Sequence, residues 1–377
     1  MKTTFFHCAT TLLLAGALGI SAHAQAPTPV PSMMAPPMPM MGPPPPPATP
    51  AMQRVLDQLM SYDAPPIPTL TPDNARNAPS AQIAAQEVLS KDGKPAFAPI
   101  GDIFHRTIPG PGGSQLLVRF YKPVGAGNEP LPLVVYFHGG GFVIATLDTY
   151  DASCRALASG ANCIVASVAY PLAPEHPFPA APEACYAATQ YLMQNAASVG
   201  ADSAHVAVAG ESAGGNLATV VCLMAKARGG MMPVHQLLVY PYVLNSTRLP
   251  DDVLNRQFPS YLTNANAKPL GKGEGKWFWP KYVPGRYVPN QQYAEPILAL
   301  TSELRGLPPA TIIAAQIDAL ESEGEQYRDK LKAAGVPVQY QLYTSVTHEF
   351  FGLGALVPEA KQAEDFAAQQ LKTALSR

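Results

Sequence analysis

A serine in a glycine-rich turn is the residue of this chain best placed to act as a nucleophile. The sequence G-E-S-A-G-G occupies positions 210–215, directly after an apolar run at 205–209 and at the start of a helix-length stretch at 214–227. Side chains at the flanking glycines would collide with the strand and the helix that so sharp a turn brings together. This context is typical of a strand–turn–helix nucleophile turn, so Ser212 is the candidate for covalent acyl-transfer chemistry.

A second glycine motif supplies the other half of that chemistry. The sequence H-G-G-G-F at 138–142 directly follows an apolar run at 133–137. Attack on an ester carbonyl produces a tetrahedral oxyanion, which backbone N–H groups stabilise when they are aimed at it in advance. We predict that the amides of Gly139, Gly140 and Ala213 form this oxyanion hole. We expect His138 to brace the loop by hydrogen bonding and to take no part in proton transfer.

A serine hydroxyl needs a base to remove its proton, and His348 is the best placed imidazole. It follows an apolar run at 338–343 through a loop expected at 344–347, and it precedes the C-terminal helical stretch. The competing histidines lie in the N-terminal leader, before strands or in a proline-rich segment: His7, His23, His105, His176, His205 and His235.

The acid that orients this imidazole is predicted to be Asp318, which directly follows the apolar run at 311–317. The same aspartate, with Glu321 three residues later, also fits a capping box for the next helix. Glu321 and Glu323 are alternative acids. The chain order Ser212, Asp318, His348 is the order found in the α/β-hydrolase fold.

The elements that must position these side chains alternate along the chain. Continuous apolar runs of this kind are typical of strands that are buried on both faces of a parallel sheet. Strands alternating with helices predict the α/β class, with a mostly parallel central sheet flanked by helices and a core built from residues 101–242 and 297–377. The strands are expected at 116–121, 133–137, 163–169, 205–209, 236–240, 311–317 and 338–343, and the helices at 148–159, 181–195, 214–227, 321–334 and 359–375.

One segment, residues 243–296, breaks the alternation and is too long for an ordinary loop. Its aromatic residues, and the proline-interrupted helical pattern of residues 51–100, predict a helical cap over the sheet. Phe142, Trp277 and Trp279 either line an acyl pocket there or pack within the cap. The sequence G-K-G-E-G-K at 271–276 lacks the Ser or Thr of a phosphate-binding loop, so we expect a flexible turn.

The N-terminus has the layout of a secretory signal peptide over residues 1–24. Lys2 is followed by an apolar stretch at 11–20, too short to span a membrane, and by Ala-His-Ala at 22–24. We therefore expect an exported protein, periplasmic or secreted, with no stable membrane insertion. Residues 25–50 are rich in Pro and Met and predict a disordered linker.

Cysteine usage is compatible with export but does not settle the redox state of the thiols. Cleavage of the leader would remove Cys8 and leave an even number of cysteines. Those that remain could form one or two disulfides, or they could be small buried thiols: Cys154, Cys163, Cys185 and Cys222.

Composition excludes several classes of function. The 377 residues include 25 Lys and Arg against 27 Asp and Glu, a formal charge of −2, so the basic excess that binds nucleic acid is missing. His348-Glu349 is not followed by the second histidine of a zinc helix, because position 352 is Gly. We expect no metal and no cofactor. The oligomeric state cannot be read from the sequence.

Taken together, these motifs resemble the bacterial hormone-sensitive-lipase family of α/β-hydrolase carboxylesterases, from about residue 51 to the C-terminus. The matching positions include Y-P-L-A-P-E at 170–175 and H-E-F-F-G at 348–352 besides the two glycine motifs and Asp318. The resemblance implies a carboxylesterase for short- to medium-chain acyl esters, a cap made of N-terminal helices and an insertion, and no metal. Pro171 stands where members usually carry Arg, a departure that removes a local ion pair and touches no catalytic residue.

Two other functions are compatible with the same residues. The predicted triad could serve an amidase or an acyltransferase, which a comparison of matched ester and anilide substrates would distinguish. The fold could also belong to a non-catalytic exported binding module, which would not be labelled by a fluorophosphonate.

Overall fold

The computed structural model describes residues 45–127, 129–285 and 289–376. Contacts within the chain divide it into Met1–Met40 and Met41–Arg377, and all the described residues belong to the second unit. The predicted signal peptide, and the predicted linker up to residue 44, lie outside the described residues. None of the helices within the described ranges is both long and apolar enough to cross a membrane.

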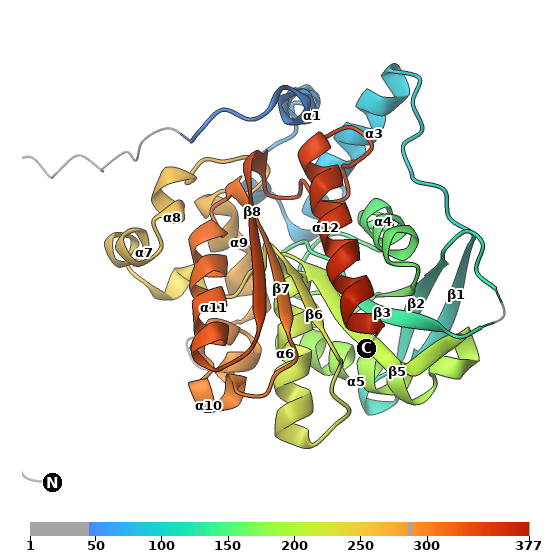
Figure 1. Ribbon diagram of the computed structural model, residues 1–377. Coiled ribbons are helices and arrows are strands. Elements are labelled where there is room, and N and C mark those ends of the chain that lie inside the picture. The colour runs from blue at the N-terminus through green and yellow to red at the C-terminus, as the bar shows by residue number, and fades with distance from the viewer. Residues whose placement is uncertain (1–44, 128, 286–288, 377) are drawn as a thin grey trace, which may run out of the picture. The chain divides into compact units, whose positions relative to one another are not determined.

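A single eight-stranded sheet forms the centre of the described unit (Figure 1). Its strand order is β1-β2-β4-β3-β5-β6-β7-β8. The pairs β1–β2 and β2–β4 are antiparallel and all other neighbours are parallel, which confirms the predicted mostly parallel α/β sheet. The strands are β1 (Asp102–Pro109), β2 (Gln115–Lys122), β3 (Leu131–Phe137), β4 (Ile164–Val168), β5 (Ala201–Glu211), β6 (Gln236–Val239), β7 (Ala310–Ile317) and β8 (Val338–Thr347).

Helices cover both faces of this sheet. Strand β3 is continuously apolar because its side chains on both faces are buried against these helices. Val134 and Tyr136 pack into the core on one face, with α4 and α12. Leu133, Val135 and Phe137 pack into the core on the other face, with α5, α6 and α11. The α-helices are α1 (Pro50–Met60), α2 (Pro72–Arg76), α3 (Ala81–Lys91), α4 (Asp151–Ala161), α5 (Ala180–Gln194), α6 (Ala213–Arg228), α7 (Asp251–Gln257), α8 (Ser260–Thr263), α9 (Lys272–Tyr282), α10 (Thr301–Leu304), α11 (Glu321–Ala333) and α12 (Pro358–Leu375).

Two local predictions were wrong. The segment 271–276 is not a flexible turn, because α9 begins at Lys272. Its N-terminus is capped by the Glu274 side chain, which accepts a hydrogen bond from the Gly271 amide at 2.9 Å. The loop expected at 344–347 is also absent, because β8 continues to Thr347, and the Ser345 carbonyl accepts a hydrogen bond from the Thr49 amide at 2.8 Å.

The two segments from which a cap was predicted are in contact. The indole N–H of Trp277, on α9, donates to the carbonyl of Leu70 at 3.1 Å. The ring of Phe142, from the glycine-rich loop after β3, stacks on Tyr282 with a centroid distance of 3.7 Å. Phe142, Trp277 and Trp279 are buried packing residues and none of them lines the cavity described below, so the packing alternative holds for all three.

The four cysteines within the described residues are buried free thiols, which decides between the two alternatives left open by the sequence. Burial raises the pKa of each thiol, that of Cys163 to about 12. They lie within the two hydrophobic cores. These thiols therefore behave as small apolar side chains.

Candidate active site

Ser212 stands on a strained turn between β5 and α6. Its backbone angles, φ 55° and ψ −118°, lie in a region that non-glycine residues rarely occupy. The turn is possible only with glycine beside it, since a Cβ on Gly214 would lie 1.9 Å from the carbonyl oxygen of Phe137. The steric reason that the sequence suggested for these glycines is therefore confirmed.

Asp318 and His348 meet at the carboxyl ends of β7 and β8. Oδ2 of Asp318 lies 2.7 Å from Nδ1 of His348, and both side chains are buried. The second carboxylate oxygen accepts a hydrogen bond from the amide of Leu320 at 2.9 Å. The aspartate thus holds the imidazole while a backbone N–H fixes its own orientation.

Asp318 has the hydrogen bond to His348, and the alternative acid Glu323 has other partners. Helix α11 begins at Glu321 with Leu320 as its N-cap and has no side-chain cap, so Asp318 does not form a capping box. Glu323 accepts hydrogen bonds from the amides of Val243 and Leu244 and from the hydroxyl of Tyr261, which ties the start of the 243–296 segment to α11.

The electrostatic surroundings of His348 favour the protonated ring. Burial lowers its pKa, but the charge and hydrogen bond of Asp318, helped by the charges of Glu349 and Glu211, outweigh that effect and leave the pKa above its ordinary value of 6.5. When a neutral imidazole gains a proton during a reaction, such surroundings stabilise the imidazolium ion that forms.

The glycine loop after β3 is shaped by backbone hydrogen bonds. The carbonyl of Gly140 accepts from the amides of Val143 and Ile144 at 3.0 and 2.9 Å. Gly140 has φ +95°, and a Cβ there would lie 2.2 Å from the carbonyl oxygen of Ile144, so only glycine fits. This turn brings Gly140 and Gly141 to a cavity wall.

His138 braces this loop, as predicted. Its Nδ1 lies 2.8 Å from the carbonyl oxygen of Gly139 and its ring stacks on Tyr170 with a centroid distance of 4.4 Å. Burial lowers the pKa of His138 to about 4. The ring is therefore neutral at ordinary pH, and Nδ1 donates its proton to the carbonyl.

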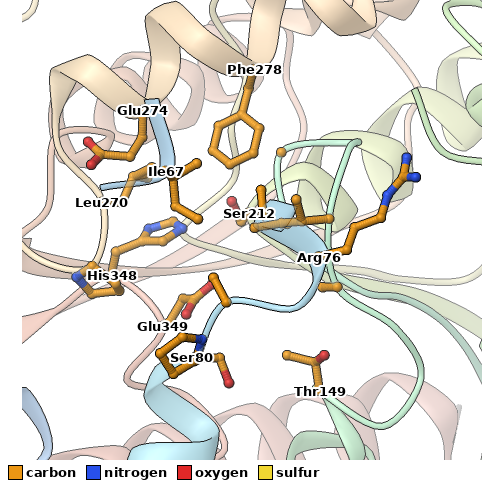
Figure 2. Close-up of a pocket in the computed structure, with 18 of the residues that line it drawn as sticks. Ile67, Arg76, Ser80, Thr149, Ser212, Leu270, Glu274, Phe278, His348 and Glu349 are labelled. Atoms are coloured by element: carbon orange, nitrogen blue, oxygen red, sulfur yellow. The ribbon is translucent and has the colours of Figure 1, made fainter. Parts of the chain in front are cut away.

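Ser212 and His348 face one cavity, which Figure 2 shows with the ring of His348 pointing across it toward the serine. Gly140, which was predicted to serve the oxyanion hole, also lines it, and so does Gly141, which was not. The predicted donors Gly139 and Ala213 are not among the lining residues. The carbonyl of Gly139 accepts from the hydroxyl of Tyr170 at 3.3 Å.

The remaining walls come mostly from the two segments that were predicted to form a cap. Residues 67–83 contribute Ile67, Arg76 and Ile83, and the 243–296 segment contributes Leu270 and Phe278. Most of these side chains are apolar, and the space they enclose is about 140 Å³. The described part of the chain contains no group of three or more His, Cys, Asp or Glu side chains that could hold a metal ion.

Comparison with known proteins identifies the family. The sequence model of a family with the α/β hydrolase fold matches residues 134–352, which include the turn of Ser212, Asp318 and His348. The chain belongs to this α/β-hydrolase family, of the hormone-sensitive-lipase type. The resemblance read from the sequence is thereby confirmed.

Relatives of this hydrolase are esterases. It is 38% identical over 282 residues to the carboxylesterase NlhH of Mycobacterium tuberculosis, an alignment that covers 74% of this chain and 85% of the relative. It is 32% identical over 254 residues to an ethyl acetate hydrolase of Pseudomonas putida, covering 66% and 76% of the two chains.

Solved structures give the same result. A thermostable esterase from Pseudomonas putida superposes with a TM-score of 0.77 at 33% identity, over 88% of this hydrolase and 98% of that chain. An esterase from the archaeon Pyrobaculum calidifontis superposes with a TM-score of 0.75 at 35% identity, over 87% and 98%. The hydrolase is therefore an enzyme of the carboxylic ester hydrolase class.

Two acids next to Ser212 and His348 in the sequence of this hydrolase were not anticipated as part of the site. Glu211, directly before Ser212, accepts hydrogen bonds from the hydroxyls of Tyr136 and Tyr240. Burial raises the pKa of Glu211 to about 7, although these hydrogen bonds oppose the change. Glu349 lines the cavity beside His348 and accepts a hydrogen bond from Tyr150 at 3.3 Å. Adjacency in sequence to Ser212 and His348 was the only signal for these acids.

Proposed function

We propose that this hydrolase is a serine carboxylesterase that cleaves short- to medium-chain acyl esters through an acyl-enzyme intermediate. The observation that carries the proposal is the 2.7 Å contact between Asp318 and His348 at the wall of a cavity that Ser212 also lines. A nucleophile, a base and an orienting acid are the three groups that this chemistry requires.

In the proposed acylation, Oγ of Ser212 attacks the ester carbonyl while Nε2 of His348 takes its proton. The bond to the alcohol oxygen then breaks, and His348 returns the proton to the leaving alcohol. In deacylation, water attacks the acyl-enzyme, with His348 again taking a proton, and the carboxylic acid leaves with Ser212 restored. Asp318 holds the ring in the tautomer that leaves Nε2 free and stabilises its charged form.

The oxyanion is proposed to bind to backbone amides of the glycine loop and of Ala213, which follows Ser212. Gly140 is supported as a donor by its place in the cavity wall. Gly139 remains a prediction. Gly141 is a further candidate, since it lines the same wall, and two loop amides with Ala213 would supply three donors.

The preference for short and medium acyl chains rests on the cavity. Its apolar lining suits an alkyl chain, and its size is set by large side chains of the cap such as Ile67, Leu270 and Phe278. The name of one relative, ethyl acetate hydrolase, points to a small ester as the substrate of that protein.

We also propose that the mature protein is exported and acts on small-molecule esters. The layout of residues 1–24 supports export, and the balanced charge supports a partner other than nucleic acid. The cap is proposed to consist of residues 51–100 and 243–296, supported by the contact of Trp277 with Leu70.

The decisive experiment compares the wild type with Ser212→Ala on chromogenic esters of two to twelve acyl carbons. We expect wild-type kcat/KM to be highest at two to six carbons and low beyond ten. In Ser212→Ala we expect kcat to fall by about 10⁵-fold or more, with thermal unfolding unchanged. A fluorophosphonate should label the wild type and not the variant. Labelling of the variant, or retention of most of its activity, would place the nucleophile elsewhere.

A further inference from the structure

Arg76, at the end of α2 in the N-terminal cap segment, has all five of its side-chain donors in hydrogen bonds, four of them to segments outside α2. Its Nε donates to the carbonyl of Val143 at 2.9 Å, and one terminal nitrogen donates to that of Ala173 at 3.0 Å. The guanidinium also makes a bidentate pair with Glu175 at 2.6 and 3.0 Å, and contacts Asp73 at 3.3 Å. Five donors meeting five acceptors leave this group no freedom to turn.

These contacts join three segments that are far apart in the sequence. Val143 belongs to the loop that follows β3, and its amide donates to the carbonyl of Gly140. Ala173 belongs to the loop that follows β4, and its amide donates to the carbonyl of Phe142 at 2.9 Å. Arg76 therefore bonds to both segments that fix the shape of the glycine loop.

The guanidinium of Arg76 takes no direct part in the cavity. The stem of Arg76 lines the wall, but the guanidinium points away from Ser212 and His348 (Figure 2). Glu175 is the carboxylate partner of Arg76, and the hydrogen bond from Arg76 lowers the pKa of Glu175 to about 2. The pair therefore favours the charged form of Glu175.

We propose that Arg76 is a positioning residue that locks the glycine loop at Gly140 in the geometry needed for oxyanion binding, and so couples the docking of the cap to the rate of the chemical step. The inference rests on the proposed function, since it assigns Arg76 a role in the same site. A displaced donor loop slows the chemical step, because an error of about 1 Å in a preorganised group costs on the order of 100-fold in rate.

A positioning role for Arg76 predicts a selective loss in kcat, which a purely structural contact would not predict. Loss of the Arg76 side chain removes its stem from the wall, but it should leave the larger apolar side chains Ile67, Leu270 and Phe278 in place, and it releases the Val143 carbonyl. We therefore expect the loss in kcat, with KM little changed. Lysine at this position keeps the charge but cannot reach five acceptors, so charge alone should not restore the rate.

The test measures kcat and KM on a short chromogenic ester for Arg76→Ala, Arg76→Lys and Glu175→Gln. For Arg76→Ala we expect kcat to fall by about 10- to 100-fold with KM within threefold of wild type. Arg76→Lys should recover less than half of that loss on a logarithmic scale. Glu175→Gln should fall by about threefold or less, because the bonds to the two carbonyls remain.

A matched control pair lies on the surface of the core. Arg228 and Glu183 form the same bidentate contact, at 2.8 and 2.6 Å, and neither lines the cavity. Arg228→Ala should therefore leave kcat within twofold of wild type. Hydrogen exchange in the peptide spanning residues 139–147 should accelerate in Arg76→Ala and not in Arg228→Ala, at a temperature where thermal unfolding shows both to be folded.

The outcomes separate the two proposals. An inactive wild type that no fluorophosphonate labels contradicts the proposed function. An active wild type with unchanged kcat and unchanged loop exchange in Arg76→Ala overturns only the role of Arg76. Full recovery in Arg76→Lys would also overturn it, since charge would then suffice. If Arg76→Ala does not fold, Arg76→Lys takes its place, and an unchanged kcat with unchanged loop exchange in Arg76→Lys overturns the role of Arg76.

Discussion

The sheet of this hydrolase and its proposed cap, residues 51–100 and 243–296, contribute to the cavity in different ways. Ser212, Asp318 and His348 all follow strands of the sheet, β5, β7 and β8, and both faces of that sheet are covered by helices. The cap segments are built of short helices and 3₁₀ turns, and they bring mostly apolar walls. The comparison teaches that the proposed catalytic groups depend on the central sheet, while the proposed limit on substrate size depends on side chains of the two cap segments.

The largest effect that would sharpen this comparison is expected for Asp318→Asn. The asparagine oxygen can still accept the Leu320 amide, so folding should be intact, but its NH₂ group would face Nδ1 of His348 and favour the wrong tautomer. We expect kcat to fall by about 10³- to 10⁴-fold, measured on a short ester. Asp92→Asn, in a surface pair with Arg54, is the control and should leave kcat unchanged. A fall of less than tenfold in Asp318→Asn would contradict the role given to the sheet.

The pH dependence of the rate tests the same region with a smaller effect. His348 acts as a base only when neutral, so activity rises as pH passes upward through its pKa. Because Asp318 holds that pKa above 6.5, the midpoint of kcat/KM should lie above pH 6.5, and the rate should fall by about tenfold for each pH unit below it. In Asp318→Asn the midpoint should move down, since the charge that opposes burial most strongly is then lost and only the weaker effects of Glu349 and Glu211 remain. A flat profile from pH 5 to 8 would argue against His348.

The smallest of these effects is expected in the cap and should concern selectivity. Phe278 stands over Gly141, and a Cβ on that glycine would lie 2.4 Å from its ring. Phe278→Ala should raise kcat/KM for acyl chains of eight to ten carbons, relative to chains of four, by up to about tenfold. The reason is that removal of the ring enlarges the cavity, so that longer chains fit. Phe258→Ala, at a buried cap aromatic that does not line the cavity, should lose stability without changing this ratio. Equal shifts in both variants would mean that the cap sets substrate size only through its stability.

The same contrast explains how much could be read from the sequence. The strands β3 to β7 could be predicted from continuous apolar runs because both of their faces are buried, and Asp318 was found because it follows such a run. His348 follows the edge strand β8, in which apolar and polar residues alternate. Strand β1 carries polar and exposed residues at the sheet edge, so no run marks it. Helix α9 was not predicted because glycines at its start are typical of a turn, whereas the helix is stabilised there by a cap that Glu274 makes.

The residues of the site that could not be predicted depend on contacts between distant positions. Arg76 and Glu175 are 99 residues apart, and nothing in either local sequence indicates the pair. The aromatic residue that α9 contributes to the wall is Phe278 and not Trp277 or Trp279. This follows from the rotation of α9 about its axis, which a segment without a clear hydrophobic period does not reveal. Gly141 lies next to predicted donors, but only the turn at Gly140 decides which amides reach the wall.

The four interior thiols have a practical consequence for handling the protein. Since each sulfur is sequestered and its thiolate disfavoured, the native state should neither require an oxidant to form nor be altered by dithiothreitol. Recombinant material from a reducing cytoplasm and from an oxidising compartment should then be interchangeable. The rate at which iodoacetamide alkylates these sulfurs would therefore measure how often the helical layers open.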